Sequence, residues 1–159
     1  MKKVYIAQTK NNGKGIFASK DLKKGETIFV WKGKIVDGFY LPKNFTYANG
    51  ADWNNWFSIG NNKYINPTKS NPGRYINHSC NPNSGVKAIR KMVAIRNIKK
   101  DTQITMDYST VEEDQNWKMK CFCKEKNCRK ILKSVHFLPK KTFSKLKSVI
   151  PKYFQKLRD

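Results

Sequence analysis

The sequence predicts a mainly β fold with short helices, and three observations support this prediction. Short apolar runs separated by turn residues occupy the first two-thirds of the chain. Residues 85–89 and 92–95, joined by Arg90-Lys91, have the pattern of a β-hairpin. Apolar residues recur at helical spacing in the C-terminal tail. With 159 residues, 38% of them hydrophobic, the chain can build one domain around its own core.

The expected strands are bounded by clear turn signals. Residues 4–8, 15–18 and 27–36 are apolar runs that predict strands, and they are separated by Asn11-Asn12-Gly13 and Lys23-Lys24-Gly25. Glycine and asparagine tolerate the backbone conformations of tight turns, so the chain is expected to reverse at both places.

One local pattern occurs twice, at residues 21–28 and 97–104, where a polar turn leads into a strand. Two copies this short indicate a repeated turn and not a solenoid. Residues 37–73 are rich in Asn, Pro, Gly and aromatic residues, and we expect irregular loops and a short helix there. In the tail, the apolar residues Phe143, Leu146, Val149 and Ile150 recur at helical spacing and predict an amphipathic basic helix. We expect this helix to dock on the domain and to be interrupted at Pro151.

The charge limits the partners of the protein. There are 33 Lys and Arg residues against 11 Asp and Glu, which gives a formal net charge of +22. Such a field attracts nucleic acid, an anionic membrane or an acidic protein patch. The alternative is that the Lys and Asn content reflects genome base composition, and the sequence leaves both open. No apolar run approaches the ~20 residues of a membrane span, and the N-terminus does not resemble a secretory signal, so we expect an intracellular protein.

Four cysteines, Cys80, Cys121, Cys123 and Cys128, favour a zinc site over disulfides. Three of them fall within eight residues, which is a crowded arrangement for two disulfides, and no secretory context is present. Four thiolates suit tetrahedral zinc. The alternative is four reduced cysteines without metal.

Four motifs carry most of the functional information. They are Gly13-Lys14-Gly15-Ile16-Phe17-Ala18, the run from Arg74 to Asn83 containing Asn77-His78-Ser79-Cys80-Asn81-Pro82-Asn83, Ile104-Thr105-Met106-Asp107-Tyr108, and the cysteine segment 121–128. In order and spacing they resemble a SET domain followed by a post-SET zinc segment, over roughly residues 4 to 132. The glycine motif is weak alone, whereas the Asn-His-Ser-Cys run and the cysteine spacing are specific in combination.

The resemblance implies a fold and a domain organisation. It implies a SET-domain β fold of small sheets with a knot-like threaded segment, a post-SET zinc site and a C-terminal basic helix. We expect the SET domain at residues 1–116, the post-SET zinc segment at 117–132 and a basic helical tail at 133–159. Cys80, Cys121, Cys123 and Cys128 would then bind one structural zinc, because a four-thiolate site has no open position for catalysis.

The resemblance also implies an activity, the transfer of a methyl group from S-adenosylmethionine to a protein lysine. A neutral lysine amine attacks the methyl carbon directly, so the site must disfavour the ammonium form, whose pKa is ordinarily ~10.4. Tyr108 is the candidate catalytic residue, and its neighbour Asp107 is expected to have a structural hydrogen-bonding role.

The remaining site residues are assigned by the same resemblance. The cofactor is expected to contact Lys14, Gly15, Ile16, Arg74, Asn77, His78, Trp117 and Phe122. The substrate channel is expected to be lined by Trp31, Met106, Tyr108 and Trp117. Met106 stands where the family commonly has Phe or Tyr, and its adaptable apolar side chain predicts that di- and trimethylation are allowed.

The implied substrate is a histone or another protein of a nucleic-acid-containing assembly, with nucleic acid contact through the basic surface and tail and no membrane partner. The implied location is the nucleus or cytoplasm, or a host nucleus for a microbial or viral source. The acidic run Glu112-Glu113-Asp114 is interpreted as a solvated loop or as a local attraction for a cationic peptide. The competing functions are a zinc-stapled nucleic-acid-binding module and a cofactor-binding scaffold, both without catalysis.

Overall fold

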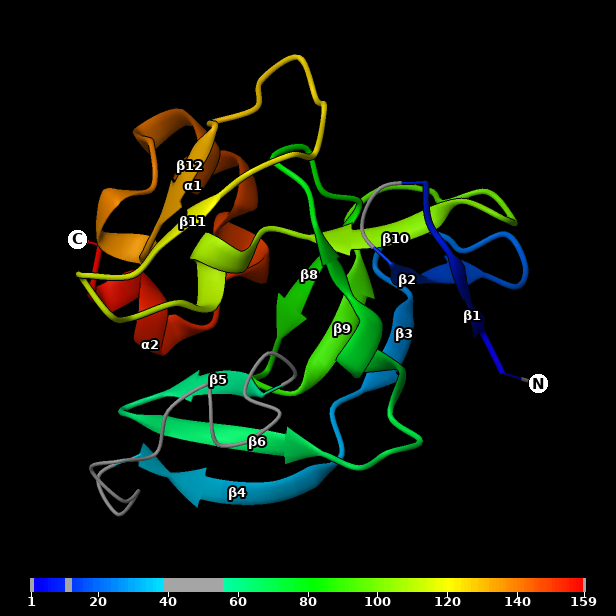
Figure 1. The fold of residues 1–159 in the computed structure, drawn as a ribbon, viewed down its shortest axis with the longest axis horizontal. Coiled ribbons are helices and arrows are strands. Elements are labelled where there is room, and N and C mark those ends of the chain that lie inside the picture. Colours follow the sequence, from blue (N-terminus) through cyan, green and yellow to red (C-terminus); the bar gives the residue numbers. More distant parts are fainter. Residues whose placement is uncertain (1, 11–12, 39–55, 159) are drawn as a thin grey trace.

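The computed structural model describes residues 2–10, 13–38 and 56–158. This part of the chain consists of small β sheets with a few short helices, as the sequence predicts (Figure 1). None of the helices in the described ranges is long and apolar enough to cross a membrane.

The first sheet has four strands and joins both ends of the expected SET region. Its order is β1 (Val4–Gln8), β2 (Lys14–Ala18), β10 (Gln103–Met106) and β7 (Asn77–His78). Strand β10 is antiparallel to β2 and parallel to the two-residue strand β7. The sheet therefore brings three of the four sequence motifs side by side. The knot-like threading of the chain stays a prediction.

The second and third sheets each have three strands. The second has the order β3 (Thr27–Val30), β9 (Lys91–Ala94) and β8 (Ser84–Lys87), and it contains the predicted hairpin. The turn expected at Arg90-Lys91 is wrong, because residues 88–90 form the turn and Lys91 pairs with Lys87. The third has the order β4 (Gly33–Asp37), β6 (Lys63–Pro67) and β5 (Phe57–Gly60).

The single strand expected over residues 27–36 is wrong, because two strands of different sheets occupy it. Strand β3 pairs with β9 and strand β4 pairs with β6, so the chain changes sheets at Trp31-Lys32. The local signal for this change is Lys32-Gly33, since glycine commonly marks a break, but the apolar residues on both sides of it allow the segment to be taken for one strand. The irregular loops expected within residues 37–73 are wrong for residues 57–67, where β5 and β6 form strands. Residues 39–55 of the same segment lie outside the described ranges.

The remaining elements are short. A two-stranded ribbon pairs β11 (Lys118–Lys120) with β12 (Ile131–Lys133). Two α-helices and four 3₁₀ helices complete the described elements: α1 (Lys140–Leu146), α2 (Lys152–Lys156), η4 (Pro72–Tyr75), η5 (Tyr108–Val111), η6 (Val135–Phe137) and η7 (Lys147–Val149).

The two copies of the repeated turn pair with each other. Leu22 and Ile98, at equivalent positions of the copies, form an antiparallel bridge. The amide of each residue donates to the carbonyl of the other, at 2.8 and 2.9 Å. Because both side chains are buried, the repeat closes the domain with a symmetric contact between the segments that lead into β3 and β10.

The C-terminal tail packs on the domain, as predicted, and its helix is interrupted at Pro151. Helix α1, the turn η7 and helix α2 replace one long helix. In Figure 1 this segment, coloured orange to red, lies against the body of the molecule beside η5 and the β11–β12 ribbon. Its apolar residues belong to the same hydrophobic cluster as the strands: Val135, Leu138, Phe143, Leu146, Val149, Ile150 and Phe154.

The acidic run after Tyr108 has a structural role, which corrects its interpretation as a solvated loop. The Glu113 carboxylate accepts hydrogen bonds from the backbone amides of Asn61 and Asn62, at 3.0 and 2.9 Å. It also accepts one from the Tyr153 hydroxyl at 2.6 Å. One side chain therefore links the β5–β6 turn to helix α2. The sequence does not predict this role, because the partners of Glu113 lie far from it in the chain.

The tail is predicted to contribute to stability through Phe154, which is fully buried. Replacing Phe154 with alanine should lower the free energy of unfolding by about 3–5 kcal/mol, because it removes apolar contacts and leaves a cavity. Phe137→Ala is the matched control, since Phe137 lies in the same tail but is 51% exposed, and it should change stability by less than about 1 kcal/mol. Urea unfolding of both variants tests this; equal losses would contradict it.

Candidate functional site

The centre of the site is the parallel pairing of β7 with β10. In this register Asn77 lies opposite Thr105 and His78 opposite Met106. The Ser79 amide continues the pairing by donating to the Met106 carbonyl at 2.9 Å. Residues almost thirty positions apart are thus fixed side by side immediately before Tyr108.

Tyr108 begins η5, and its side chain turns back toward β7. Its hydroxyl donates to the Ile76 carbonyl at 2.6 Å, and its amide donates to His78 Nδ1 at 3.2 Å. The two rings meet edge to face, with centroids 5.3 Å apart. Burial raises the pKa of the Tyr108 phenol to about 12. The hydroxyl therefore keeps its proton at neutral pH and acts as a hydrogen-bond donor.

His78 is neutral in this environment, and its tautomer follows from its contacts. Burial lowers the pKa of His78 to about 4. Because Nδ1 accepts the Tyr108 amide, the single ring proton of the neutral imidazole lies on Nε2. Nε2 is 3.3 Å from Cys80 Sγ and donates to it. His78 therefore connects the Tyr108 backbone to the cysteine cluster.

The glycine motif lies against β7, where a side chain would not fit. Gly13 has φ +64°, a left-handed conformation that glycine adopts without a steric cost. A Cβ on Gly15 would lie 2.7 Å from the side chains of Gln103 and Thr9 and 3.0 Å from Asn77 Nδ2. Asn77 Nδ2 in turn donates to the Lys14 carbonyl at 3.2 Å. The structure thus brings Lys14, Gly15 and Asn77 together.

The other expected cofactor residues occupy varied positions. The Ile16 side chain is fully buried in the core, and its backbone pairs with β1 on one side and with β10 on the other. Arg74, on η4, donates from Nη1 to the Pro67 carbonyl at 3.2 Å. Trp117 packs against the cysteine cluster, whereas the Phe122 side chain is 69% exposed. Their cofactor contacts stay predictions.

Of the expected channel residues, Met106 and Trp31 are buried. Met106 lies on β10 opposite His78. The Trp31 ring stacks on Phe57, with centroids 4.2 Å apart and an interplanar angle of 14°. Gly73 lies against the same ring, because a Cβ there would approach it to 2.4 Å. Trp31 therefore packs the junction between the second and third sheets, and its role as a channel wall stays a prediction.

Asp107 forms a buried ion pair that the sequence analysis missed. Its Oδ1 accepts from Arg129 Nη2 at 2.6 Å and from the Ser109 amide at 3.1 Å. The second bond caps η5, the helix that carries Tyr108. Asp107 thus has the structural role expected of it, whereas Arg129 was not singled out. Its position directly after the last cysteine was the one available signal.

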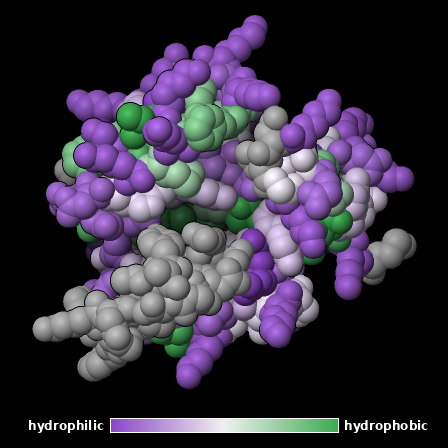
Figure 2. All heavy atoms as spheres, in the orientation of Figure 1, coloured by the Kyte–Doolittle hydropathy of each residue, from purple (hydrophilic) through white to green (hydrophobic). Residues whose placement is uncertain are grey.

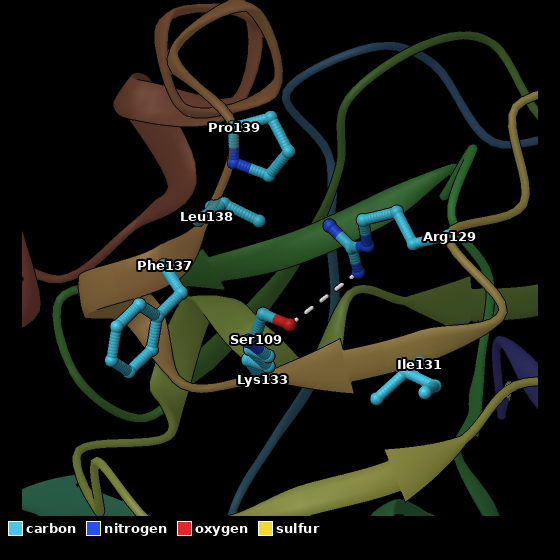
Figure 3. Close-up of a pocket in the computed structure, with 7 residues that line it drawn as sticks. All are labelled: Ser109, Arg129, Ile131, Lys133, Phe137, Leu138 and Pro139. Carbon is cyan, nitrogen blue, oxygen red and sulfur yellow. Dashed lines mark hydrogen bonds between the residues drawn. The ribbon is translucent and has the colours of Figure 1, made fainter.

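A cavity of about 180 Å³ lies beside this ion pair. It is lined by Ser109, Arg129, Ile131, Lys133, Phe137, Leu138 and Pro139 (Figure 3). In Figure 3 the Arg129 guanidinium extends toward Ser109, and the dashed line marks the 3.4 Å contact from Nη2 to the hydroxyl. Arg129 Nε and Nη1 are buried and have no hydrogen-bond partner among the described residues. The cavity gives room for water to satisfy such groups.

The four cysteines converge, and all are free thiols. Cys80 Sγ and Cys121 Sγ are 3.8 Å apart, which matches the edge of a ZnS₄ tetrahedron with Zn–S bonds of about 2.3 Å, an edge of about 3.8 Å. The ligand atoms of His78, Cys80, Cys121 and Cys123 all lie within 4.8 Å of one another. Cys128 packs against the same cluster, and its Sγ donates to the Cys121 carbonyl at 3.7 Å. The donor set fits zinc.

A model of the SET domain family matches residues 13–109, more than half of the chain. The chain belongs to the SET-domain family. Among curated relatives, histone-lysine N-methyltransferase 2D of Homo sapiens is 33% identical over 138 residues, covering 80% of this chain and 2% of that protein. The putative histone-lysine N-methyltransferase ASHH4 of Arabidopsis thaliana is 33% identical over 144 residues, covering 83% of this chain and 40% of ASHH4. This SET domain therefore spans less than half the length of these relatives.

Solved structures confirm the SET-domain fold. SUVH6 of Arabidopsis thaliana, solved in complex with SAM, has a TM-score of 0.64 at 23% identity, over 80% of this chain and 32% of that one. A putative histone methyltransferase of Plasmodium falciparum has a TM-score of 0.51 at 26% identity, over 68% of this chain and 94% of that one.

The buried ion pair generates a stability prediction. Arg129→Met should lower the free energy of unfolding by about 3–5 kcal/mol, because it leaves the Asp107 carboxylate buried without a cation. Adding Asp107→Asn should restore part of the loss, since the amide oxygen can still cap η5. Arg96→Met is the control, because Arg96 is exposed, and it should cost less than about 1 kcal/mol. Urea unfolding of the parent, Arg129→Met, Arg129→Met/Asp107→Asn and Arg96→Met measures these changes. A double variant less stable than Arg129→Met would contradict the explanation.

Proposed function

We propose that this SET domain is a protein-lysine N-methyltransferase that uses S-adenosylmethionine. The observation that carries the proposal is the Tyr108 hydroxyl, held protonated beside Ile76 and the Asn77-His78 pair at the glycine motif. Membership of the SET family and relatives named histone-lysine N-methyltransferases support it.

The proposed S-adenosylmethionine site combines backbone groups with polar side chains that can form hydrogen bonds to the cofactor. The backbone of residues 14–16, with Asn77 and His78, would hold the cofactor, and Arg74, Trp117 and Phe122 would complete the contact. The missing Cβ of Gly15 allows backbone and the Asn77 amide to approach closely. When bound, the cofactor supplies a methyl carbon made electrophilic by its sulfonium.

The residues around Tyr108 favour the neutral form of the substrate lysine and orient it for methyl transfer. The buried surroundings of Tyr108 and Met106 disfavour an ammonium ion by desolvation, which favours the neutral amine nucleophile. The Tyr108 hydroxyl and the Ile76 carbonyl orient the reacting groups, and this alignment accounts for much of the rate. No covalent enzyme intermediate is needed. Met106 offers an adaptable apolar wall, so we propose that di- and trimethyl-lysine can form.

The proposed substrate is a histone or another protein of a nucleic-acid-containing assembly, and the proposed location is chromatin. Relatives named for histone-lysine methylation support this, including two named for H3 lysine-36. The charge of +22 favours a substrate accompanied by a polyanion, because a free basic peptide is repelled. A zinc-stapled nucleic-acid-binding module predicts neither cofactor binding nor methyl transfer, and a cofactor-binding scaffold predicts cofactor binding without methyl transfer.

The proposed zinc ligands are Cys80, Cys121, Cys123 and Cys128. His78 also lies in the cluster with Cys80, Cys121 and Cys123. We leave it out of the proposed set because Nδ1 accepts the Tyr108 amide, which supports a ring proton on Nε2 and leaves no free lone pair for a metal. The metal would then have a structural role beside the cofactor residues.

Elemental analysis tests the zinc assignment. The purified chain should contain about one zinc, Cys128→Ala should contain substantially less and melt at a lower temperature, and His78→Gln should keep its metal. Loss of zinc from His78→Gln with retention in Cys128→Ala would overturn the ligand set. Much less than one zinc in active protein would overturn the site itself.

The catalytic assignment is tested by Tyr108→Phe. Methyl transfer to nucleosomes should fall by about 100-fold or more, on the scale of losing one positioned donor, while calorimetry shows cofactor binding retained. Tyr5→Phe, which removes an exposed hydroxyl bonded to Asp101, is the matched control and should leave turnover unchanged. Mass spectrometry of the parent's product should show di- or trimethyl-lysine. Near-normal turnover by Tyr108→Phe would refute the role, and a product limited to monomethyl-lysine would refute the proposal for Met106.

A further inference from the structure

A groove of about 380 Å³ lies away from Tyr108, between the second sheet and the C-terminal tail. Four cations line it, Lys24, Lys87, Arg96 and Lys145, and its remaining lining is Gly25, Val93, Ala94, Ile95, Ser148 and Val149. These residues come from the turn before β3, from the β8–β9 hairpin and from the tail around η7. We call this the basic groove. Its lining contains no carboxylate.

The four cations keep their charge uncompensated. None of them forms an ion pair with a carboxylate of the described residues, whereas Lys3, Lys20 and Lys99 elsewhere on the surface do. Arg96 donates to the Asn81 Oδ1 and carbonyl oxygen at 3.3 and 3.1 Å, and Lys145 donates to the same Oδ1 at 3.3 Å. The Asn81 side chain thus holds two cations near each other, while its Nδ2 donates to the Glu125 carboxylate at 3.5 Å. Glu125 is not part of the lining of the groove and forms no ion pair with either cation.

The lining chemistry selects among polyanions. It contains no aromatic ring, and proteins that bind single strands rely on aromatic side chains on which the bases stack. Of its apolar residues, Val93, Ala94 and Val149 are buried and Ile95 is partly buried, whereas membrane binding requires apolar groups that project outward. Cations on flexible stems together with a hydroxyl, as from Ser148, are the groups that contact phosphates of a duplex.

We propose that the basic groove binds the phosphate backbone of double-stranded DNA. The groove reads charge and not sequence, because lysine contacts to phosphate carry no base information. Figure 2 shows hydrophilic side chains over much of the visible face of the molecule, and this surrounding field guides the duplex without defining where it docks. The proposal does not rest on catalysis, since none of the four cations is placed at the methyl-transfer site.

The test uses the full chain and a labelled duplex of 20 base pairs, with fluorescence anisotropy at several salt concentrations. The variant Lys24→Gln/Lys87→Gln/Lys145→Gln should weaken binding tenfold or more at low salt. It should also make the slope of log K against log salt shallower by about 2 to 3, because the slope falls by about one for each phosphate that a lysine no longer neutralises. The three positions are exposed, so folding should be unchanged, as circular dichroism can verify.

The matched control is Lys32→Gln/Lys34→Gln/Lys63→Gln, which removes the same charge from exposed positions around the third sheet. It should change the slope by less than one. An equal loss of duplex affinity in both triple variants would overturn the proposal, because it would indicate attraction by the overall positive charge and not by the basic groove. Tighter binding of a single strand of equal charge, or a groove variant that loses binding to anionic vesicles but not to the duplex, would overturn the DNA assignment. Tyr108→Phe should bind the duplex normally, so a failure of catalysis and a failure of this proposal are distinguishable.

Discussion

The site depends on one buried interaction, the ion pair between Asp107 and Arg129. A carboxylate with no exposed surface requires a cation, because an uncompensated charge in the interior is strongly unfavourable. Arg129 follows directly after Cys128, and Asp107 directly precedes Tyr108. The pair therefore joins the cysteine segment to the helix that carries the candidate catalytic tyrosine. Since the Arg129 amide also donates to Cys80 Sγ at 3.4 Å, the same residue contacts both ends of the proposed zinc site. The fold of the cysteine segment and the orientation of Tyr108 consequently depend on the same ion pair.

The second constraint is the short parallel strand pair. Two residues of β7 pair with β10, which by itself is too small to be stable. It is held from three sides: by the Asn77 bond to Lys14, by the Tyr108 bond to Ile76, and by the contact of His78 with Cys80. The site thus consists of segments that are individually weak and mutually supported. This explains why its residues come from four motifs distributed over most of the chain.

The sequence predicted what local strings encode. The strands at residues 4–8 and 15–18, the 85–95 hairpin, the Pro151 break and the family followed from turn residues, periodicity and the Asn-His-Ser-Cys run. It did not predict what depends on distant partners. The change of sheet at Trp31-Lys32 has only Gly33 as a local signal, and the pairing partners of the two strands lie far away in the sequence. Glu113 was interpreted as solvated because Asn61, Asn62 and Tyr153 lie 40 or more positions away. Arg129 was one cation among 33, and only burial next to Asp107 distinguishes it. The tautomer of His78 likewise follows from its contacts with Tyr108 and Cys80, which the sequence does not reveal.

The distribution of charge connects the site to the surface. Around Tyr108 the chain buries its titratable groups in a neutral or paired state: a protonated phenol, an uncharged imidazole and a closed ion pair. The basic groove does the opposite, because no carboxylate lines it and its four cations form no ion pair with a carboxylate of the described residues. A lysine entering the site must lose its proton, and the +22 field opposes the approach of any cationic segment. A polyanion in the groove would screen this field near the protein, so the same charge that repels an isolated basic peptide would favour one delivered together with DNA.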